Sequence, residues 1–324
     1  MSTNRLTRGI LAALACASCH LAHAQYPVKP VHLIVPNGPG VSTDLLARTL
    51  ADKLPGIWNQ AVVVENIAGA SGIIASERLA KSAPDGYTLM VHPAGVTTFH
   101  PALYDKLPYD PLADFEPITL LASPGIWIVL NPSVPANNVK EMVALAKAQP
   151  GKLAYATVGG TIGYPYISSV LLKNTAGIDI TYIAYKAGNQ AVPDLLGGRI
   201  QLMFDSVPTT LNQVKEGRLR PVAFLGPKRH FQAPDIPTIA EAGYPEVTGE
   251  GWNGMSGRKG TPAAIIRKIY ADVVMVMRMP DVAKRIATAG MQIVLNTPEE
   301  FDAQIRAETV KWGKVIRENK IRGE

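Results

Sequence analysis

Cysteine is almost absent from this chain of 324 residues. Only Cys16 and Cys19 occur, and both lie within the first 24 residues. Without that segment the chain has no disulfide and no thiol nucleophile, which excludes a disulfide-stapled scaffold and cysteine-based catalysis. A lipid-anchoring cysteine is the alternative interpretation, but the residues before Cys16 and Cys19 fit such a site poorly.

Long apolar runs are also lacking, and the short one at the start, within residues 1–24, has the features of a cleavable signal peptide. Arg5 and Arg8 give it a basic beginning, residues 9–18 are apolar, and a small-x-small cleavage site ends at Ala24. No run in the chain is long enough to cross a bilayer as a helix. We therefore expect a soluble mature chain that begins at Gln25 and is exported to the periplasm.

Charge of one sign is not concentrated anywhere in the sequence. Lys and Arg exceed Asp and Glu by 32 to 26, a net charge of +6, but no basic run or basic–aromatic patch occurs. This predicts no nucleic-acid partner, and it favours a small anionic ligand only weakly. The hydrophobic fraction of 47% and the charged fraction of 18% are typical of a globular protein and not of a disordered one.

Catalytic and metal-binding signatures are missing as well. No Gly-x-Ser-x-Gly nucleophile elbow occurs. The histidines beyond residue 24 lack a metal-ligand spacing; they are His32, His92, His100 and His230. We therefore expect no metal, no cofactor and no enzymatic activity. The main alternative is an exported enzyme acting on a small carboxylate, in which Asp44, Lys186 and Asp205 would have to converge as an acid–base set.

The most informative stretch that is present runs from residue 31 to residue 54. Residues 31–35 are an apolar run expected to form a buried strand, residues 44–54 have the periodicity of a helix, and the loop between them is rich in Pro, Gly and small hydroxyls. Such a turn directs free N–H groups and the positive end of the helix dipole beyond the strand. This predicts a carboxylate- or phosphate-receiving loop, although an ordinary turn with Ser42 or Thr43 as N-cap explains the pattern equally well.

Further strands and helices alternate along the chain, which indicates an α/β fold with parallel sheets. The expected strands are 61–65, 87–91, 118–122, 125–130, 153–157, 180–183, 200–205 and 219–225. A second strand–glycine loop–helix unit occupies residues 153–171. Asp205 ends one strand, where α/β folds place site residues, but it could equally be the N-cap of the next helix.

Three helix starts are marked by their local sequence. Asn138 is expected to cap a helix through a capping box, and Thr297 opens a second capping box before a long C-terminal helix. Thr261 is expected as an N-cap followed by Pro262 at the first helical position. The apolar positions expected to face the core from the C-terminal helix are Phe301, Ile305, Trp312 and Ile316.

A series of motifs extends from Tyr26 to the C-terminus. In chain order they include Val64-Glu65-Asn66, Gly69-Ala70-x-Gly72, Ala83-Pro84-Asp85-Gly86-Tyr87, Leu107-Pro108-Tyr109-Asp110-Pro111, Asp114-Phe115-x-Pro117-Ile118, Tyr185-Lys186-x-Gly188, Asp194-Leu195-Leu196-Gly197-Gly198, Met203-Phe204-Asp205, Pro237-Thr238-Ile239-Ala240-Glu241-Ala242-Gly243 and Thr297-Pro298-Glu299-Glu300-Phe301. In content and order these motifs resemble the Bug receptors, the extracytoplasmic solute-binding proteins of tripartite tricarboxylate transporters.

The resemblance implies the Venus-flytrap fold of type II periplasmic binding proteins, with two α/β lobes joined by two crossing hinge strands. Lobe 1 would comprise residues 25–123 and 226–324, and lobe 2 would comprise residues 124–225. In this family a small carboxylated solute lies between the lobes, and its carboxylate is held by backbone N–H groups and ordered water from one glycine loop of each lobe.

The resemblance also implies which residues bind the solute. In lobe 1 they are Ser42, Thr43 and Asp44, with Ala70 and Ser71 beside them. In lobe 2 they are Gly159, Thr161, Ile162 and Gly163, with Asp205 near the floor of the cleft. No residue is assigned a catalytic or metal-binding role.

Two departures from the family pattern affect this assignment. Val41 stands where the family has a third glycine or small residue, and its branched side chain disfavours the positive φ that glycine allows. The second loop continues into Ile162, Tyr164 and Tyr166, where the family has a polar helix start. We therefore hypothesise a less polar ligand than a tricarboxylate or small amino acid, such as an aromatic carboxylate.

The sequence therefore predicts a periplasmic receptor that captures a small organic anion without changing it. The receptor would deliver its solute to a membrane permease or report it to a sensor partner, and a monomer is expected. A module that binds no ligand remains a third interpretation, in which side chains would fill the cleft.

Overall fold

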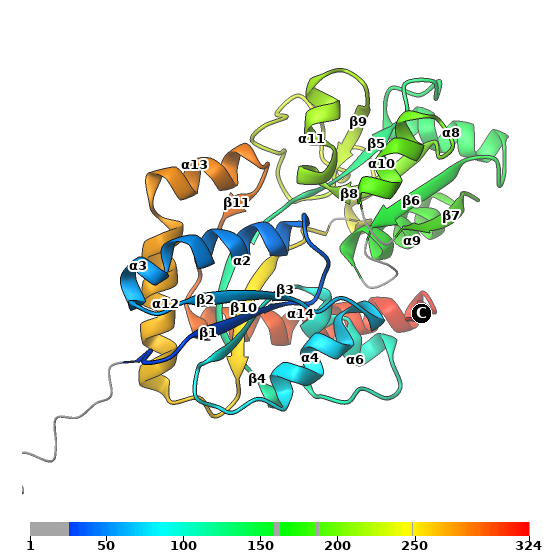
Figure 1. Cartoon of the computed structure of the whole chain (residues 1–324). Helices are drawn as coiled ribbons and strands as arrows, with labels where there is room; N and C mark the ends of the chain where they lie inside the picture. Colours follow the sequence, from blue (N-terminus) through cyan, green and yellow to red (C-terminus); the bar gives the residue numbers. More distant parts are fainter. Residues whose placement is uncertain (1–25, 159–162, 186–187, 248, 324) are drawn as a thin grey trace, which may run out of the picture.

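The computed structural model describes residues 26–158, 163–185, 188–247 and 249–323. These residues form two α/β lobes, each built around its own sheet (Figure 1). The six-stranded sheet of lobe 1 has the order β11-β4-β10-β3-β1-β2, and the five-stranded sheet of lobe 2 has the order β7-β6-β8-β5-β9. The predicted two-lobed α/β architecture is confirmed.

Lobe 1 begins with three parallel strands. β1 (Val31–Val35) lies between β2 (Val62–Asn66) and β3 (Thr88–Pro93) and pairs in parallel with both. The prediction of a parallel sheet is wrong for β10 (Asn253–Arg258), which pairs antiparallel with β3 and with β4 (Phe115–Ser123). β10 returns from lobe 2 without the helical crossover that parallel neighbours need, so it enters the sheet in the opposite direction.

Lobe 2 repeats this mixture of parallel and antiparallel strands. β6 (Ala154–Val158) pairs in parallel with β7 (Thr181–Tyr185) and β8 (Leu202–Ser206). β5 (Ile126–Leu130) arrives from lobe 1 and pairs antiparallel with β8 and with β9 (Arg220–Phe224). In both lobes, therefore, the predicted strand–loop–helix units are parallel and the strands next to the crossings are not.

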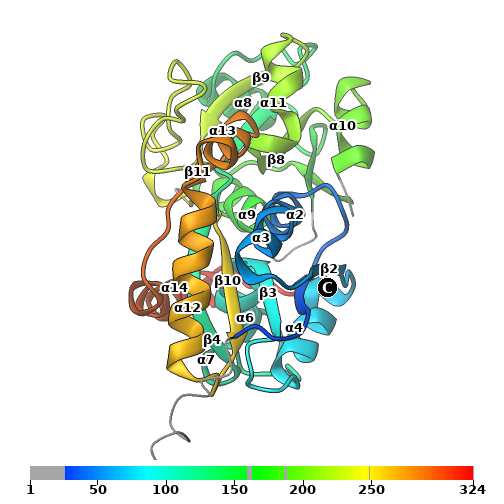
Figure 2. The same cartoon turned by 60° about the vertical axis from the view of Figure 1, so that its left-hand side comes forward.

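Helices pack on both faces of the lobe 1 sheet (Figures 1 and 2). Alternate residues of β1 point to opposite faces, so Leu33 packs with Leu46 of α2 while Ile34 packs with Leu79 of α4. The helices and short strand of lobe 1 are α2 (Ser42–Lys53), α3 (Pro55–Trp58), α4 (Ile73–Ala80), α5 (Gly95–Thr98), α6 (His100–Leu103), α7 (Pro111–Asp114), α12 (Ala263–Met277), α13 (Pro280–Thr288), β11 (Gln292–Ile293) and α14 (Pro298–Glu318). Those of lobe 2 are α8 (Val139–Ala148), α9 (Tyr164–Ala176), α10 (Gly188–Leu196) and α11 (Val207–Lys215).

Two of the three helix starts predicted from local sequence are confirmed. The Asn138 side chain accepts from the Glu141 N–H at 2.9 Å, and Thr297 and Glu300 form a reciprocal capping box at the start of α14. The third prediction is wrong by one residue: Pro262 is the N-cap of α12, and the Thr261 hydroxyl donates to the Arg258 carbonyl at 2.7 Å. The predicted core positions of α14 are buried; they are Phe301, Ile305, Trp312 and Ile316. No helix in the described ranges is both long and apolar enough to cross a membrane.

Two chain segments cross between the lobes side by side. The first joins β4 to β5 through residues 124–125, and the second leads through residues 249–252 into β10. They touch where the Ser123 hydroxyl donates to the Gly251 carbonyl at 2.8 Å. Gly125 has φ +59°, and a Cβ at this position would lie 2.7 Å from the Phe224 ring, so the first crossing requires glycine.

The segment between β9 and the second crossing packs on lobe 2. Ile239 donates its N–H to the Phe224 carbonyl at 2.7 Å, and Phe224 donates its N–H to the Pro237 carbonyl at 2.9 Å. The short helical turn η3 (Pro245–Val247) carries Val247, which is buried in the same cluster as Ile167 of α9. We therefore propose to place the second lobe boundary near residue 249 and not at 225/226.

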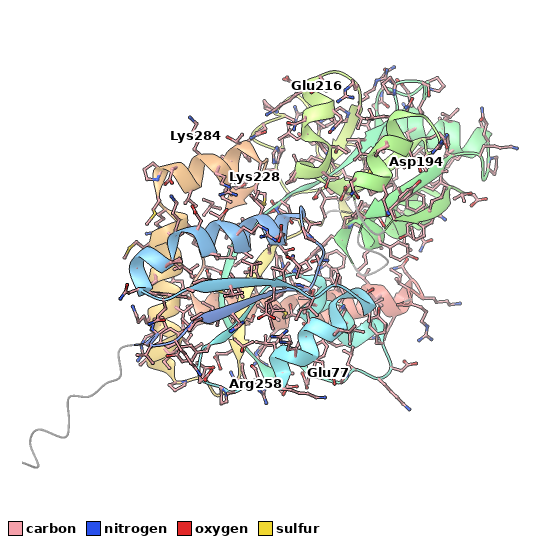
Figure 3. The ribbon with its side chains drawn as sticks, viewed as in Figure 1. Glu77, Asp194, Glu216, Lys228, Arg258 and Lys284 are labelled. Carbon is pink, nitrogen blue, oxygen red and sulfur yellow. The ribbon has the colours of Figure 1, made fainter. Side chains whose placement is uncertain are left out.

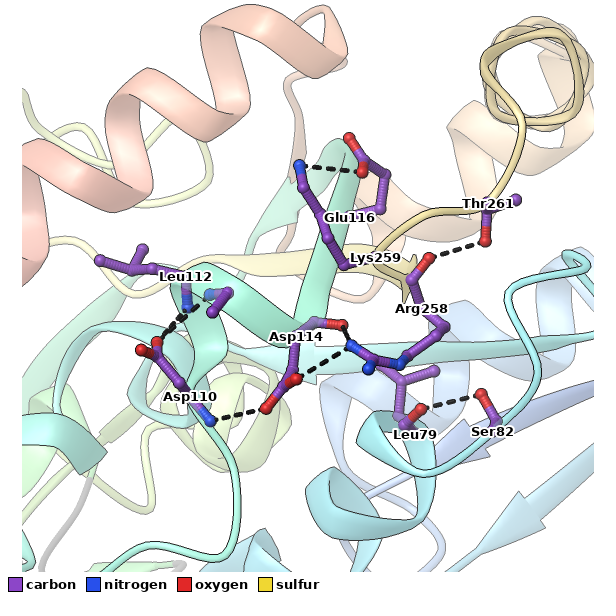
Figure 4. A network of polar contacts seen from close by, with 10 residues as sticks. Leu79, Ser82, Asp110, Leu112, Asp114, Glu116, Arg258, Lys259 and Thr261 are labelled. Atoms are coloured by element: carbon purple, nitrogen blue, oxygen red, sulfur yellow. Dashed lines mark hydrogen bonds and ion pairs between the residues drawn. The ribbon is translucent and has the colours of Figure 1, made fainter.

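The Pro-rich motif at residues 107–111 is anchored by ion pairs at the far end of lobe 1 (Figure 4). Asp110 caps α7 by accepting from the Leu112 N–H at 2.9 Å. Asp114 accepts from Arg258 at 3.0 Å, and Lys259 pairs with Glu116 at 2.9 Å. This network joins β10 to the start of β4 and has a structural role, since it lies at the other end of these strands from the crossings.

Candidate functional site

The predicted ligand loop of lobe 1 follows the carboxyl end of β1 and leads into α2. In Figures 1 and 2, α2 lies along the side of lobe 1 that is nearest lobe 2. Val41 is the N-cap of α2, and no side chain caps its first turn. Because the N–H groups of a first helical turn have no partner within the helix, this end can receive an anion. The alternative prediction that Ser42 or Thr43 caps the helix is wrong.

Asp44 holds this loop together from within. It is 4% exposed, and its Oδ2 accepts from the Gly40 N–H and from Arg48 Nε, each at 3.0 Å. Its Oδ1 accepts from Asn66 Nδ2 at 2.9 Å. Burial alone would raise the pKa of Asp44, but the hydrogen bonds from Arg48, Gly40 and Asn66 outweigh it and lower that pKa. Both carboxylate oxygens are thus engaged by the protein, so Asp44 shapes the loop.

Ser42 and Thr43 also have protein partners. The Thr43 hydroxyl donates to Asn37 Oδ1 at 3.3 Å within the loop. The Ser42 hydroxyl accepts from Asn253 Nδ2 at 2.9 Å. Asn253 is buried at the start of β10, beside the second crossing, and the sequence analysis did not identify it. The sequence signal was a polar amide at the beginning of a strand whose next four residues are small or apolar.

Ala70 and Ser71 lie in a left-handed turn after β2. Four consecutive residues have positive φ: Gly69 at 133°, Ala70 at 43°, Ser71 at 55° and Gly72 at 89°. For Ala and Ser this conformation is strained, and strain of this kind concentrates at functional sites. A Cβ on Gly72 would lie 3.0 Å from the Pro36 side chain, so the turn packs against the first ligand loop.

His100 lies close to the backbone of this turn. It is buried on α6, and its Nδ1 forms a hydrogen bond with the Tyr109 hydroxyl of the Pro-rich motif. Its buried Nε2 makes no hydrogen bond of ordinary geometry. Burial lowers the pKa of His100 to about 4, against a smaller opposing effect of the Ser71 backbone. Burial therefore keeps the imidazole neutral, and its hydrogen bond to Tyr109 holds the Pro-rich motif.

The predicted ligand residues of lobe 2 are only partly described. Gly159, Thr161 and Ile162 lie outside the described residues, as does Lys186. Gly163 is described and is the N-cap of α9. The starts of α10 and α11 lie close together, because a Cβ on Gly188 at the start of α10 would be 2.7 Å from Thr209 of α11.

Asp205 is the last residue but one of β8, shortly before α11 begins, and is 3% exposed. Its Oδ1 accepts from the Ser206 N–H at 2.7 Å, while its Oδ2 is buried without a hydrogen-bond partner. Desolvation raises the pKa of Asp205 to about 7, although the hydrogen bond from Ser206 and the nearby Thr209 hydroxyl oppose this. The alternative that Asp205 caps the next helix is wrong, because the N-cap of α11 is Ser206.

Tyr164, one of three residues expected to make the ligand wall of lobe 2 more apolar and aromatic, packs its side chain inside the protein. Tyr164 is 5% exposed, and its ring packs against Phe99 and Trp312 with centroids 4.8 and 5.1 Å away. Its hydroxyl donates to Glu308 of lobe 1 at 2.7 Å. Tyr166 packs against Tyr182 at 5.0 Å. Tyr164 is therefore almost fully covered by protein.

Two cavities lie beside the crossings. The larger cavity has a volume of about 410 Å³, and Trp252 is one of the residues that line it. The next residue, Asn253, does not line it, because its side chain contacts Ser42 of the first ligand loop. The smaller cavity, of about 250 Å³, lies next to it. The larger one is lined by Tyr164, Glu250, Trp252, Gln304, Glu308 and Trp312, among others. Neither cavity is lined by a residue predicted to bind the solute.

An acid–base set of Asp44, Lys186 and Asp205 gains no support from the geometry, because both Asp44 oxygens are engaged within their own loop. Arg199, another cation near the lobe 2 loops in sequence, pairs with Asp194 at 2.8 Å and is 81% exposed at its side chain. Within the described part of the chain, no group of three His, Cys, Asp or Glu residues is arranged to hold a metal ion.

Comparisons with known proteins agree with this architecture. BugT of Bordetella pertussis is 33% identical over 311 residues, which cover 96% of this chain and 95% of BugT. A solved R. palustris protein with adipate has a TM-score of 0.85 and 29% identity, covering 92% of this chain and 99% of that one. MatC from Rhodopseudomonas palustris with bound malate has a TM-score of 0.82 and 28% identity, covering 90% of this chain and 100% of MatC.

A family model matches most of the chain. The model describes the tripartite tricarboxylate transporter family receptor, and it matches residues 46–321. This range includes most of the helix that follows the first ligand loop, the second loop and both crossings. The chain belongs to the tripartite tricarboxylate transporter receptor family, whose members are extracytoplasmic solute-binding proteins.

Proposed function

We propose that this receptor captures an aliphatic dicarboxylate between its lobes. The observation that carries the proposal is the uncapped start of α2, beside Ser42 and Asn253 and next to the strained Ala70–Ser71 turn. These groups offer N–H donors with little competing negative charge, because the Asp44 carboxylate is already engaged. Two neighbours of similar fold were solved with adipate and with malate.

The ligand-binding set we propose combines the two lobes. Lobe 1 contributes the backbone at Ser42, Thr43, Ala70 and Ser71, and lobe 2 contributes Gly163 and Asp205. Gly159, Thr161 and Ile162, which lie outside the described residues, remain predicted members of the set. An aliphatic ligand replaces the earlier hypothesis of an aromatic one, because the Tyr164 ring is already covered by Phe99 and Trp312.

Thermal unfolding of residues 25–324 tests this proposal. We expect adipate or malate to raise the melting temperature in a saturable way and to be recovered unchanged, because a ligand that binds only the folded state stabilises it. Benzoate and citrate are the matched comparisons. Stabilisation by benzoate alone would restore the aromatic hypothesis, chemical conversion of the acid would establish an enzyme, and no shift with any acid would contradict a carboxylate receptor.

We further propose that the protein is a monomer that is exported by its first 24 residues and serves a membrane permease or a sensor. The family assignment supports export, and the basic, apolar and small-residue pattern of residues 1–24 supports cleavage before Gln25. Mass measurement of the exported protein tests the cleavage site, and light scattering tests the monomer. A retained N-terminus would contradict the signal peptide.

A further inference from the structure

The start of α9 is fastened to lobe 1. Tyr164, the first residue of α9, donates its hydroxyl to Glu308 Oε2 of α14 at 2.7 Å. Trp252 of the second crossing donates its indole N–H to the same oxygen at 2.8 Å. Gln304 donates to the other oxygen of Glu308 at 2.9 Å. One carboxylate therefore joins lobe 2, lobe 1 and a crossing segment.

The ring of Tyr164 also contacts lobe 1, in addition to the hydrogen bond of its hydroxyl. Phe99 and Trp312, which make edge-to-face contacts with it, both belong to lobe 1. On the other side, a Cβ on Gly249 would lie 3.0 Å from Tyr164 Cδ1, so the crossing chain passes directly against the ring. Burial, followed by the charge of Glu308, raises the pKa of Tyr164 well above its usual value, and its hydroxyl remains a donor.

The contact continues along the same two helices. Near the other end of α9, Asn174 donates to Asn319, the C-cap of α14, at 2.5 Å. Ile167 of α9 and Ile316 of α14 are buried in one cluster with Phe99. Figure 1 shows α14 below lobe 2, extending from lobe 1 toward α9. Lobe 2 therefore has one helix that is held against lobe 1, in addition to the two crossings.

We propose that Tyr164 is a positioning residue: its bond to Glu308 makes the start of α9 the fulcrum about which the two lobes close. This inference rests on the proposed function, because it concerns closure around a solute. Gly163, which precedes Tyr164, is a proposed ligand residue, so a fixed fulcrum also fixes one side of the ligand site relative to α2. Solute affinity then depends on a hydroxyl that does not touch the solute.

Tyr164→Phe is the sharpest test, because it removes the hydroxyl and retains the ring. We expect about ten-fold weaker binding of adipate by titration calorimetry, in line with the loss of a hydrogen bond to a charged group. Tyr26→Phe is the matched control, since the Tyr26 hydroxyl is also buried and bonded, at 2.6 Å to the Gly86 carbonyl, but entirely within lobe 1. The control should lower the melting temperature without changing adipate affinity.

Lobe movement can be measured directly, because residues 25–324 contain no native cysteine. Glu77→Cys and Glu216→Cys place spin labels in different lobes (Figure 3). In the background of the native Tyr164 we expect a narrow distribution of distances between the labels, and in Tyr164→Phe a broader one with and without adipate.

The outcomes separate this inference from the proposed function. An unchanged distance distribution and unchanged adipate affinity in Tyr164→Phe, with a lowered melting temperature, would show that Tyr164 is only a packing residue. If the native protein binds no carboxylate, the proposed function fails, and the ligand-free distance distributions still decide whether Tyr164 fixes the lobes.

Discussion

Each lobe has a buried aspartate near a junction between a strand and a helix, Asp44 in lobe 1 and Asp205 in lobe 2. The surroundings of the two carboxylates differ, and they shift the two pKa values in opposite directions. In lobe 1, Asp44 accepts three hydrogen bonds, which lower its pKa despite burial. In lobe 2, Asp205 accepts one bond at Oδ1 and leaves Oδ2 without a partner, and burial raises its pKa to about 7. The difference lies in the supply of donors, since both side chains are almost fully buried.

The comparison shows that the carboxylate of Asp44 has all its oxygens hydrogen-bonded within the protein, whereas that of Asp205 does not. The Asp44 network is complete without a ligand, so lobe 1 presents a preorganised edge. The free oxygen of Asp205 leaves lobe 2 with an unsatisfied buried group, which costs free energy until something bonds to it. A solute that offers Asp205 a hydrogen bond would remove that cost. Four substitutions test the comparison.

Asp205→Asn should have the largest effect, and it depends on pH. Because the folded-state pKa of Asp205 is raised, its neutral form contributes stability that is present below pH 4 and is lost as the pH rises through 7. Asn does not titrate, so its advantage over Asp should grow with pH to as much as about 4 kcal/mol of unfolding free energy. Denaturant unfolding from pH 4 to pH 8 measures this difference.

The buried histidines change stability in the opposite direction over the same range. His92 and His100 have pKa values lowered to about 4, so each costs stability as the pH falls below its unfolded-state value. Both are present in the native protein and in Asp205→Asn, so their effect cancels in the difference. Parallel pH profiles of the two proteins would show that Asp205 is not held neutral.

Asp44→Ala should lower the unfolding free energy by about 3 kcal/mol, because it removes the acceptor of three hydrogen bonds and leaves Asn66 and Gly40 unsatisfied. Asp302→Ala is the control; Asp302 pairs with Arg306 on the surface of α14, and its loss should cost less than about 0.5 kcal/mol. Equal effects in urea unfolding would mean that the Asp44 network is no stronger than a surface pair.

Asn253→Ala removes the contact between β10 and Ser42. We expect a loss of about 1 kcal/mol of stability from one neutral hydrogen bond, together with weaker adipate binding because Ser42 loses its fixed position. Calorimetry of the variant beside Asn296→Ala, which removes a side-chain acceptor of the Leu120 N–H within lobe 1, separates the two effects. Unchanged affinity in Asn253→Ala would remove Asn253 from the site.

Ser71→Gly should have the smallest effect on stability and the opposite sign. Glycine adopts φ 55° without strain, but it is more flexible in the unfolded chain, so we expect a gain of about 0.5 kcal/mol. Adipate affinity should fall at the same time, because the turn loses rigidity. A melting temperature that drops in Ser71→Gly would show that the left-handed turn is held by side-chain contacts of Ser71 and stores no strain.

Much of the fold followed from local sequence. The apolar run at 31–35 became β1, and Asn138 and Thr297 capped the helices they were expected to start. The directions of β5 and β10 could not be predicted, because they depend on which lobe each strand comes from and not on its own residues. For the same reason the predicted lobe boundary at 225/226 depends on the tertiary structure, and we propose that it lies near residue 249.

The sequence by itself determined the strand–loop–helix units, the caps at Asn138 and Thr297, and the family, because these depend on residue type and short spacing. Only the tertiary structure decided what the polar groups do. It engaged Asp44 within its own loop, left one oxygen of Asp205 unpaired, brought Asn253 to Ser42 and directed Tyr164 to Glu308. These roles are set by partners that are distant in sequence, and the strength of a buried polar interaction depends on whether such a partner is present.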